Sequence, residues 1–174
     1  MAFHHVAIAT RDLVATHHFY TDVMGFDLVR VEAVPLEQEP GWARHVFYDT
    51  GNGEMLAVWD IHDDSIGDYR TDISTGLGLP VFINHIAFAA RDLADLDARK
   101  NRWLAHGHDV MRADHGWCTS VYAVDPNGIL VEFCATTRSF TADDHREALE
   151  LLSAQEPKIA TPPPPEFFRA APVA

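Results

Sequence analysis

The sequence has few cysteines, little positive charge and no long apolar run. Among its 174 residues only Cys118 and Cys134 are cysteines, too few for a disulfide framework, which favours a reducing cytoplasm. Its 13 Lys and Arg stand against 26 Asp and Glu, a formal net charge of −13. Nucleic acid and anionic membrane are therefore not expected partners, because both need positive patches. No apolar run is long enough to span a bilayer, and the start of the chain shows no secretory signal.

What the sequence does contain is an internal repeat. FHHVAIATRDL at 3–13 returns as INHIAFAARDL at 83–93, and DTGNGEMLAVW at 49–59 corresponds to DPNGILVEFC at 125–134. An internal repeat of this kind indicates that the fold is built from repeated structural units. We expect two modules, 3–63 and 83–136, joined by an irregular linker at 64–82. Together they form one domain, 1–138, followed by a helix and a Pro-rich tail over 139–174.

Each module carries the same order of signals. A short alternating strand is followed by Asp12 or Asp92 as helix N-cap, by an amphipathic helix, and by Gly25 or Gly107 as C-terminal cap. Three β-rich stretches come next, with GNG or DPNG as a hairpin turn. These stretches are 27–34, 43–50 and 54–61 in the first module, and 108–113, 118–125 and 129–136 in the second. The order β-α-β-β-β, twice, predicts an α+β fold. In the tail, Phe167 and Phe168 are candidates to dock on the body or on a second subunit; a mobile tail is the alternative.

Strand alternation places one histidine on an open face in each module. His5 shares a face with Ala7 and Ala9, and His85 with Ala87 and Ala89, whereas the bulky residues face the helix. Glu132 lies in the middle of an apolar strand, where a carboxylate needs a cation or strong donors. Two histidines and one carboxylate predict a divalent metal site at His5, His85 and Glu132. A histidine on a strand is often only a hydrogen-bonded core residue, but its repetition favours a ligand.

These motifs resemble the vicinal-oxygen-chelate superfamily, which includes glyoxalase I, extradiol dioxygenases, and the bleomycin and fosfomycin resistance proteins. The resemblance covers about 3–136 and implies paired βαβββ modules whose sheets curl around a central metal pocket. It implies ligand positions on the first and last strand of each module: His5, Ala57, His85 and Glu132. Ala57 cannot bind a metal, so three protein ligands remain. Glyoxalase I normally uses four, whereas two histidines and a glutamate resemble the Fe(II) triad of extradiol dioxygenases.

The second module also resembles the dioxygenase signature around YAVDPNGILVE, residues 122–132. Tyr122, ten residues before Glu132, is implied to donate a hydrogen bond to the substrate, although a cross-strand aromatic is the structural alternative. Glu54 stands where these enzymes generally carry a catalytic histidine. His115 is the candidate for a second pocket histidine, against an exposed loop residue, and His45 is a further candidate in the first module.

The resemblance therefore favours an extradiol-type dioxygenase, an oxidoreductase that acts on a small chelating diol with Fe(II); Mn(II) and Zn(II) are alternatives. His115 and Tyr122 are its expected catalytic residues. A metal-dependent lyase or isomerase like glyoxalase I, and a non-enzymatic antibiotic-binding protein, are the other hypotheses. The expected partner is a small-molecule substrate, and the long tail favours a homodimer.

Overall fold

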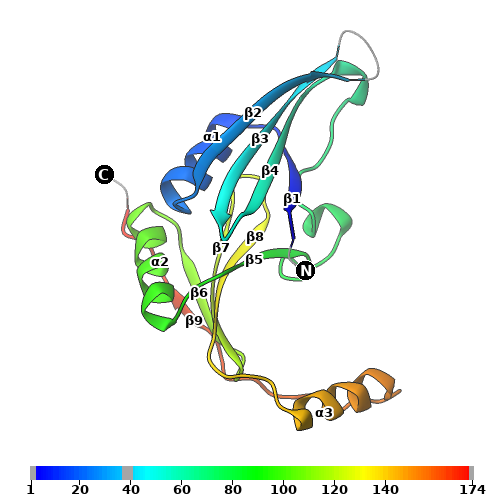
Figure 1. The fold of residues 1–174 in the computed structure, drawn as a ribbon, viewed down its shortest axis with the longest axis vertical. Helices are drawn as coiled ribbons and strands as arrows, with labels where there is room; N and C mark the ends of the chain where they lie inside the picture. Colours follow the sequence, from blue (N-terminus) through cyan, green and yellow to red (C-terminus); the bar gives the residue numbers. More distant parts are fainter. Residues whose placement is uncertain (1–2, 37–40, 173–174) are drawn as a thin grey trace. The chain divides into compact units, whose positions relative to one another are not determined.

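The computed structural model describes residues 3–36 and 41–172 and has the expected order of elements (Figure 1). The first module contains β1 (His5–Thr10), α1 (Leu13–His18), β2 (Asp27–Pro35), β3 (Trp42–Gly51) and β4 (Glu54–His62). The second contains β5 (His85–Ala89), α2 (Leu93–Ala105), β6 (Val110–Asp114), β7 (Cys118–Val124) and β8 (Leu130–Thr136). This is β-α-β-β-β twice, so the predicted α+β fold of two βαβββ modules is confirmed.

The strands of the described ranges form a four-stranded sheet, β1-β4-β3-β2, and a five-stranded sheet, β5-β8-β7-β6-β9, and neither closes into a barrel. In the first sheet β1 pairs with β4 in parallel, whereas β2, β3 and β4 are antiparallel neighbours. Its register places Ala7 opposite Ala57, and Ala57 opposite Phe47. The first strand of the module is therefore next to its last strand, which positions His5 beside β4.

The helix boundaries follow the predicted caps. The Asp12 carboxylate accepts a hydrogen bond from the Ala15 amide, and Asp92 accepts one from the Asp95 amide. Gly25 and Gly107 have φ angles of 82° and 83°, the left-handed conformation that glycine adopts readily at a helix C-terminus. In the first module, the α-helix continues as a π-helical turn, Phe19–Val23, which buries Phe19, Tyr20 and Val23.

The chain divides into two compact units. Unit 1 comprises Met1–Phe88 and Ala123–Val131, and unit 2 comprises Ala89–Tyr122 and Glu132–Ala174. Unit 1 therefore contains the first module and the DPNG turn of the second. The core of unit 1 includes Tyr20, Tyr48 and Leu56, and that of unit 2 includes Trp103 and Phe133; all of these side chains are buried. The domain boundaries expected from the sequence stay a prediction.

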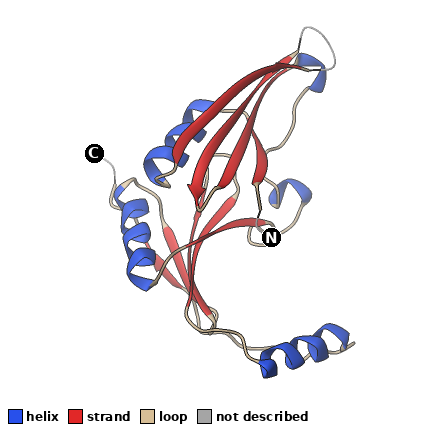
Figure 2. Ribbon diagram, viewed as in Figure 1, coloured by secondary structure: helices blue, strands red, loops and turns tan. Residues whose placement is uncertain are grey.

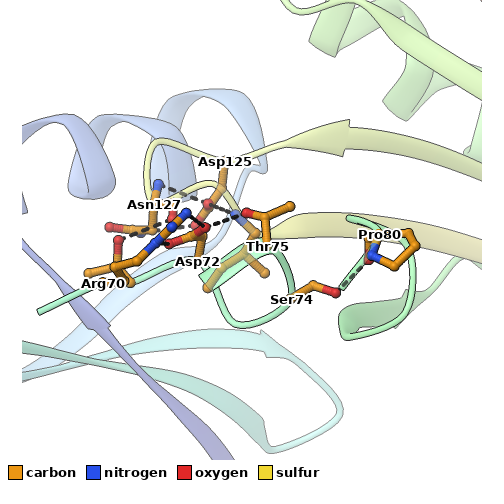
Figure 3. A network of polar contacts seen from close by, with 9 residues as sticks. Arg70, Asp72, Ser74, Thr75, Pro80, Asp125 and Asn127 are labelled. Atoms are coloured by element: carbon orange, nitrogen blue, oxygen red, sulfur yellow. Dashed lines mark hydrogen bonds and ion pairs between the residues drawn. The ribbon is translucent and has the colours of Figure 1, made fainter. Parts of the chain in front are cut away.

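The linker is ordered by polar contacts with the DPNG turn (Figure 3). Thr71 donates a hydrogen bond to the Asn127 carbonyl at 3.1 Å, while Asp72 accepts from Arg70 and from Thr75. A Cβ on Gly128 would lie 2.9 Å from the Asp72 Cβ. Glycine at position 128 thus permits the close approach of linker and turn.

The C-terminal segment forms a helix and an additional strand. α3 (Ala142–Ser153) begins at a Thr141–Asp144 capping box and buries none of its residues; Figure 2 shows it away from the strands of its unit. β9 (Glu166–Phe168) then pairs with β6, with Phe168 opposite Val110. The backbone of Phe167 and Phe168 therefore pairs with the body of the same chain, one of the alternatives considered from the sequence, while the Phe167 side chain stays exposed. Within the described ranges, none of the helices combines the length and apolar content that a membrane crossing needs.

Candidate active site

His5 and His85 both belong to unit 1, and both are exposed on strands whose neighbouring alanines on the same face, Ala7 and Ala87, are also exposed. The predicted open face is therefore present on β1 and on β5. The Nδ1 of His85 donates a hydrogen bond to the Phe82 carbonyl at 2.9 Å. That bond fixes the tautomer in which Nε2 carries the lone pair, the arrangement typical of a metal-ligating histidine.

The linker holds the start of β5 in place. Asn84 donates from its side-chain amide to the Ile73 carbonyl at 2.8 Å, and its backbone amide donates to Ser74 Oγ at 3.2 Å. Ser74 in turn donates to the Pro80 carbonyl at 2.6 Å (Figure 3). These bonds fix the backbone immediately before His85. These bonds could not be predicted from the sequence, because the linker has no periodic pattern.

Unit 2 brings three of the predicted residues together. The Tyr122 hydroxyl and His115 Nε2 are 2.9 Å apart, and Glu132 accepts a short hydrogen bond from Ser120. Tyr122, Ser120 and Glu132 are buried, whereas His115 lies exposed between β6 and β7. The buried carboxylate at 132 therefore has the strong donor that its position required.

Electrostatics keep the Tyr122 phenol protonated. Burial raises the pKa of Tyr122 to about 12, and the negative charge of Glu132 adds to this effect. The phenol therefore keeps its proton for hydrogen bonding, and its oxygen lies 2.9 Å from His115 Nε2. Burial also raises the pKa of the Cys118 thiol to about 12. Neither Cys118 nor Cys134 forms a disulfide.

Ser120 is the functional candidate that the sequence reasoning missed. It lies two residues before Tyr122 on β7, so strand alternation already placed it on the face of Tyr122. A fully buried serine on that face is a possible partner for any carboxylate of the neighbouring strand. Strand alternation could thus have identified Ser120, but a single serine within a β-rich stretch does not form a recognisable motif.

The three-residue metal set stays a prediction. His5 and His85 belong to unit 1 and Glu132 to unit 2, and no group of three or more His, Cys, Asp or Glu side chains that could hold a metal is found in residues 3–36 and 41–172. The donor chemistry nevertheless suits a divalent ion, because it combines imidazole nitrogens, one of fixed tautomer, with a buried carboxylate. The roles of His115 and Tyr122 as catalytic residues likewise stay predictions.

A family model, Glyoxalase/Bleomycin resistance protein/Dioxygenase superfamily, matches residues 2–133. The chain belongs to this superfamily. Its members include enzymes and typically bind divalent metals. No curated protein sequence matches the chain.

Several solved structures of the superfamily share the fold. A lactoylglutathione lyase from Agrobacterium tumefaciens is 29% identical, with a TM-score of 0.52 over 77% of this chain and 92% of that one. The fosfomycin resistance protein FosX from Listeria monocytogenes is 20% identical, with a TM-score of 0.52 over 83% and 97%. TnmS3, an antibiotic-binding protein from Streptomyces sp. CB03234, is 16% identical, with a TM-score of 0.52 over 79% and 97%. The last two likenesses show the fold alone.

Proposed function

We propose that this protein is a metal-dependent enzyme that cleaves the ring of a small catechol-like diol by extradiol-type dioxygenation. The observation that carries the proposal is the hydrogen bond between Tyr122 and His115, 2.9 Å long. Tyr122 corresponds to the tyrosine of the dioxygenase signature, and His115 is the histidine nearest to the position where the resemblance implies a second one. The reaction places both atoms of O2 in the ring-opened product, so it needs no external reductant.

Under this proposal His5, His85 and Glu132 hold the metal, with Fe(II) preferred over Mn(II) or Zn(II). When bound, the metal supplies Lewis-acid stabilisation of the ionised diol and a position for dioxygen. Ser120 orients the Glu132 carboxylate through its hydrogen bond. The substrate is a free small molecule, and we expect the active protein to be a homodimer.

The proton chemistry follows from the protonation state of Tyr122. Its hydroxyl and His115 Nε2 are hydrogen-bonded in the resting protein. A substrate oxygen that binds beside this pair accepts a hydrogen bond from the protonated phenol, and His115 accepts the proton of the diol. General acid–base groups of this kind contribute about 10²–10⁴-fold to a rate.

A second candidate is a metal-dependent lyase or isomerase that acts through an enediolate. The 29% identity to a structure described as a lactoylglutathione lyase favours it. Such a reaction consumes no oxygen and proceeds with Zn(II), Ni(II) or Co(II).

The two candidates are separated by oxygen uptake. The full chain is loaded anaerobically with Fe(II) and supplied with a panel of catechols, and oxygen consumption is followed together with ring-cleavage absorbance. We expect uptake with at least one catechol, and a loss of about 10²-fold or more in Tyr122→Phe and His115→Ala. His145→Ala, in the exposed face of α3, is the matched control and should leave the rate unchanged.

No oxygen uptake with any diol would contradict the dioxygenase. Anaerobic conversion of the hemithioacetal of methylglyoxal and glutathione, by protein loaded with Zn(II) or Ni(II), would instead support the lyase.

A further inference from the structure

His45 carries a buried nitrogen atom that lacks a hydrogen-bond partner. It lies on β3, and its Nε2 is inaccessible to water and unpartnered among the described residues. Buried polar atoms in folded proteins almost always have a partner, and an exception calls for an explanation such as a bound ion. The imidazole ring is not free to turn away from this position. It stacks on Trp59 at a centroid distance of 3.8 Å and contacts Phe47 at 4.1 Å.

His45 lies on the face of the first sheet that also carries His5 and Ala57. Phe47 is opposite Ala57 in the register of β3 and β4, and His45 is two residues from Phe47, so both point to that face. Ala57 occupies one of the four ligand positions implied by the resemblance, but its methyl group cannot bind a metal. A donor at this end of the site must therefore come from another residue of the same face.

The His45 and His5 rings lie within the range of a shared ion. Their centroids are 6.2 Å apart, with an interplanar angle of 68°. A metal–nitrogen bond of about 2.1 Å limits two imidazoles on one ion to a centroid separation of about 6.5 Å. The Nδ1 of His5 lies 2.8 Å from His4 Nδ1, so a bond between these atoms is compatible with a ligand at His5 Nε2.

We propose that His45 is a further metal ligand, which reaches from β3 to the ion held by His5 and so replaces the ligand that Ala57 lacks. This inference rests on the proposed metal-dependent function and adds a ligand to its site. It also bears on the choice between the two reactions, because one more protein ligand leaves one position fewer for substrate and dioxygen.

The test uses Co(II) alone, titrated into the metal-free full chain, with affinity measured by calorimetry and ligand number read from the visible spectrum. We expect one Co(II) per chain in the unsubstituted protein. His45→Ala should weaken binding by at least about tenfold and change the intensity of the visible bands, because a nitrogen donor is lost. His5→Ala should do the same, and His145→Ala should match the unsubstituted protein. Circular dichroism establishes that each variant is folded.

A second measurement needs no substitution. X-ray absorption of the Co(II)-loaded protein counts its imidazole ligands; three are expected, from His5, His45 and His85, and two would overturn the inference. Unchanged affinity and spectrum in His45→Ala, together with loss of Co(II) in His5→Ala, would overturn His45 as a ligand and leave the proposed function standing. Absence of Co(II) binding in the unsubstituted chain would overturn both.

Discussion

At the scale of single residues, the strength of the hydrogen bond between Tyr122 and His115 can be measured without any substrate. Either single substitution already removes this bond, so the effects of the two single variants should not add up to that of the double variant. We expect a coupling of about 1 kcal/mol between Tyr122→Phe and His115→Ala in the free energy of unfolding, measured by urea denaturation.

Tyr69→Phe provides the matched control for this cycle. The Tyr69 hydroxyl donates to the Thr10 carbonyl in unit 1 and not to a side chain of unit 2. Its effect should therefore add to that of His115→Ala. An additive result for Tyr122→Phe as well would mean that the 2.9 Å contact contributes nothing to stability.

Asp95 gives the protein a specific sensitivity to acid. Its carboxylate accepts hydrogen bonds from the Arg91 amide at 3.0 Å and from Arg99 Nε at 3.2 Å. The Arg91 amide contributes most to lowering the pKa of Asp95 to about 2. Because the folded-state pKa is below the unfolded value of about 3.9, the stabilisation is complete above that pH and is lost as the pH falls towards 2.

Asp95→Asn should therefore lower the free energy of unfolding at pH 7 and flatten its decline between about pH 4 and pH 2. Urea denaturation across this range measures both effects. Asp68→Asn is the control, because the Asp68 side chain is 94% exposed and pairs only at the surface. Equal slopes in the unsubstituted protein and in Asp95→Asn would refute the assignment.

At the scale of elements, the attachment of β9 depends on Asp109. This carboxylate accepts a hydrogen bond from the Ala170 amide at 2.9 Å and another from Arg169. Both contacts lie just beyond the β6–β9 pairing. Asp109→Ala should release the strand and expose the edge of β6, so we expect hydrogen exchange of the β6 amides to accelerate by about tenfold.

Asp143→Ala, on the exposed helix α3, is the control for this experiment, because its ion pair with Arg146 lies within that helix. Exchange of β6 that is the same in Asp109→Ala and in the unsubstituted protein would mean that the strand pairing alone holds β9.

The sequence predicted the eight module strands, both module helices and both aspartate caps, because each of these rests on local signals: alternation, amphipathic spacing and a capping side chain. β9 escaped prediction. Glu166–Phe168 is short and follows a run of prolines. It becomes a strand by pairing with the edge of β6, which lies far away in the sequence. The π-helical turn after α1 escaped for a similar reason, since burial of Phe19 and Tyr20 determines it.

At the scale of the whole molecule, the repeat was the most informative feature for the candidate site. It singled out His5 and His85 as equivalent, strand alternation added Glu132, and the resemblance to dioxygenases implied Tyr122. The residues that contact these side chains could not be predicted from the sequence, because the contacts depend on strand register and on packing. Ser120 beneath Glu132 and the stacking of His45 on Trp59 are contacts between strands, and no local pattern encodes them.

The net charge of −13 predicts that salt stabilises the folded chain. Raising NaCl from about 10 mM to about 150 mM shortens the Debye length from about 30 Å to about 8 Å, which weakens repulsion among the excess carboxylates. Exposed ion pairs weaken as well, but each contributes at most about 1 kcal/mol. We expect a higher melting temperature in calorimetry, with the same rise in tetramethylammonium chloride. A rise confined to NaCl would indicate binding of sodium instead of screening.

Unit 1 is assembled from two separate stretches, Met1–Phe88 and Ala123–Val131. The second stretch supplies Asp125, whose carboxylate accepts a hydrogen bond from the buried Tyr20 hydroxyl at 2.8 Å. When the first 88 residues have left the ribosome during synthesis, unit 1 therefore still lacks its second stretch. The Tyr20 hydroxyl gains its Asp125 acceptor only after the turn near residue 125 has left the exit tunnel. Synonymous codons that slow translation between these stretches would prolong the interval in which a nascent, incomplete core is open to chaperones and proteases.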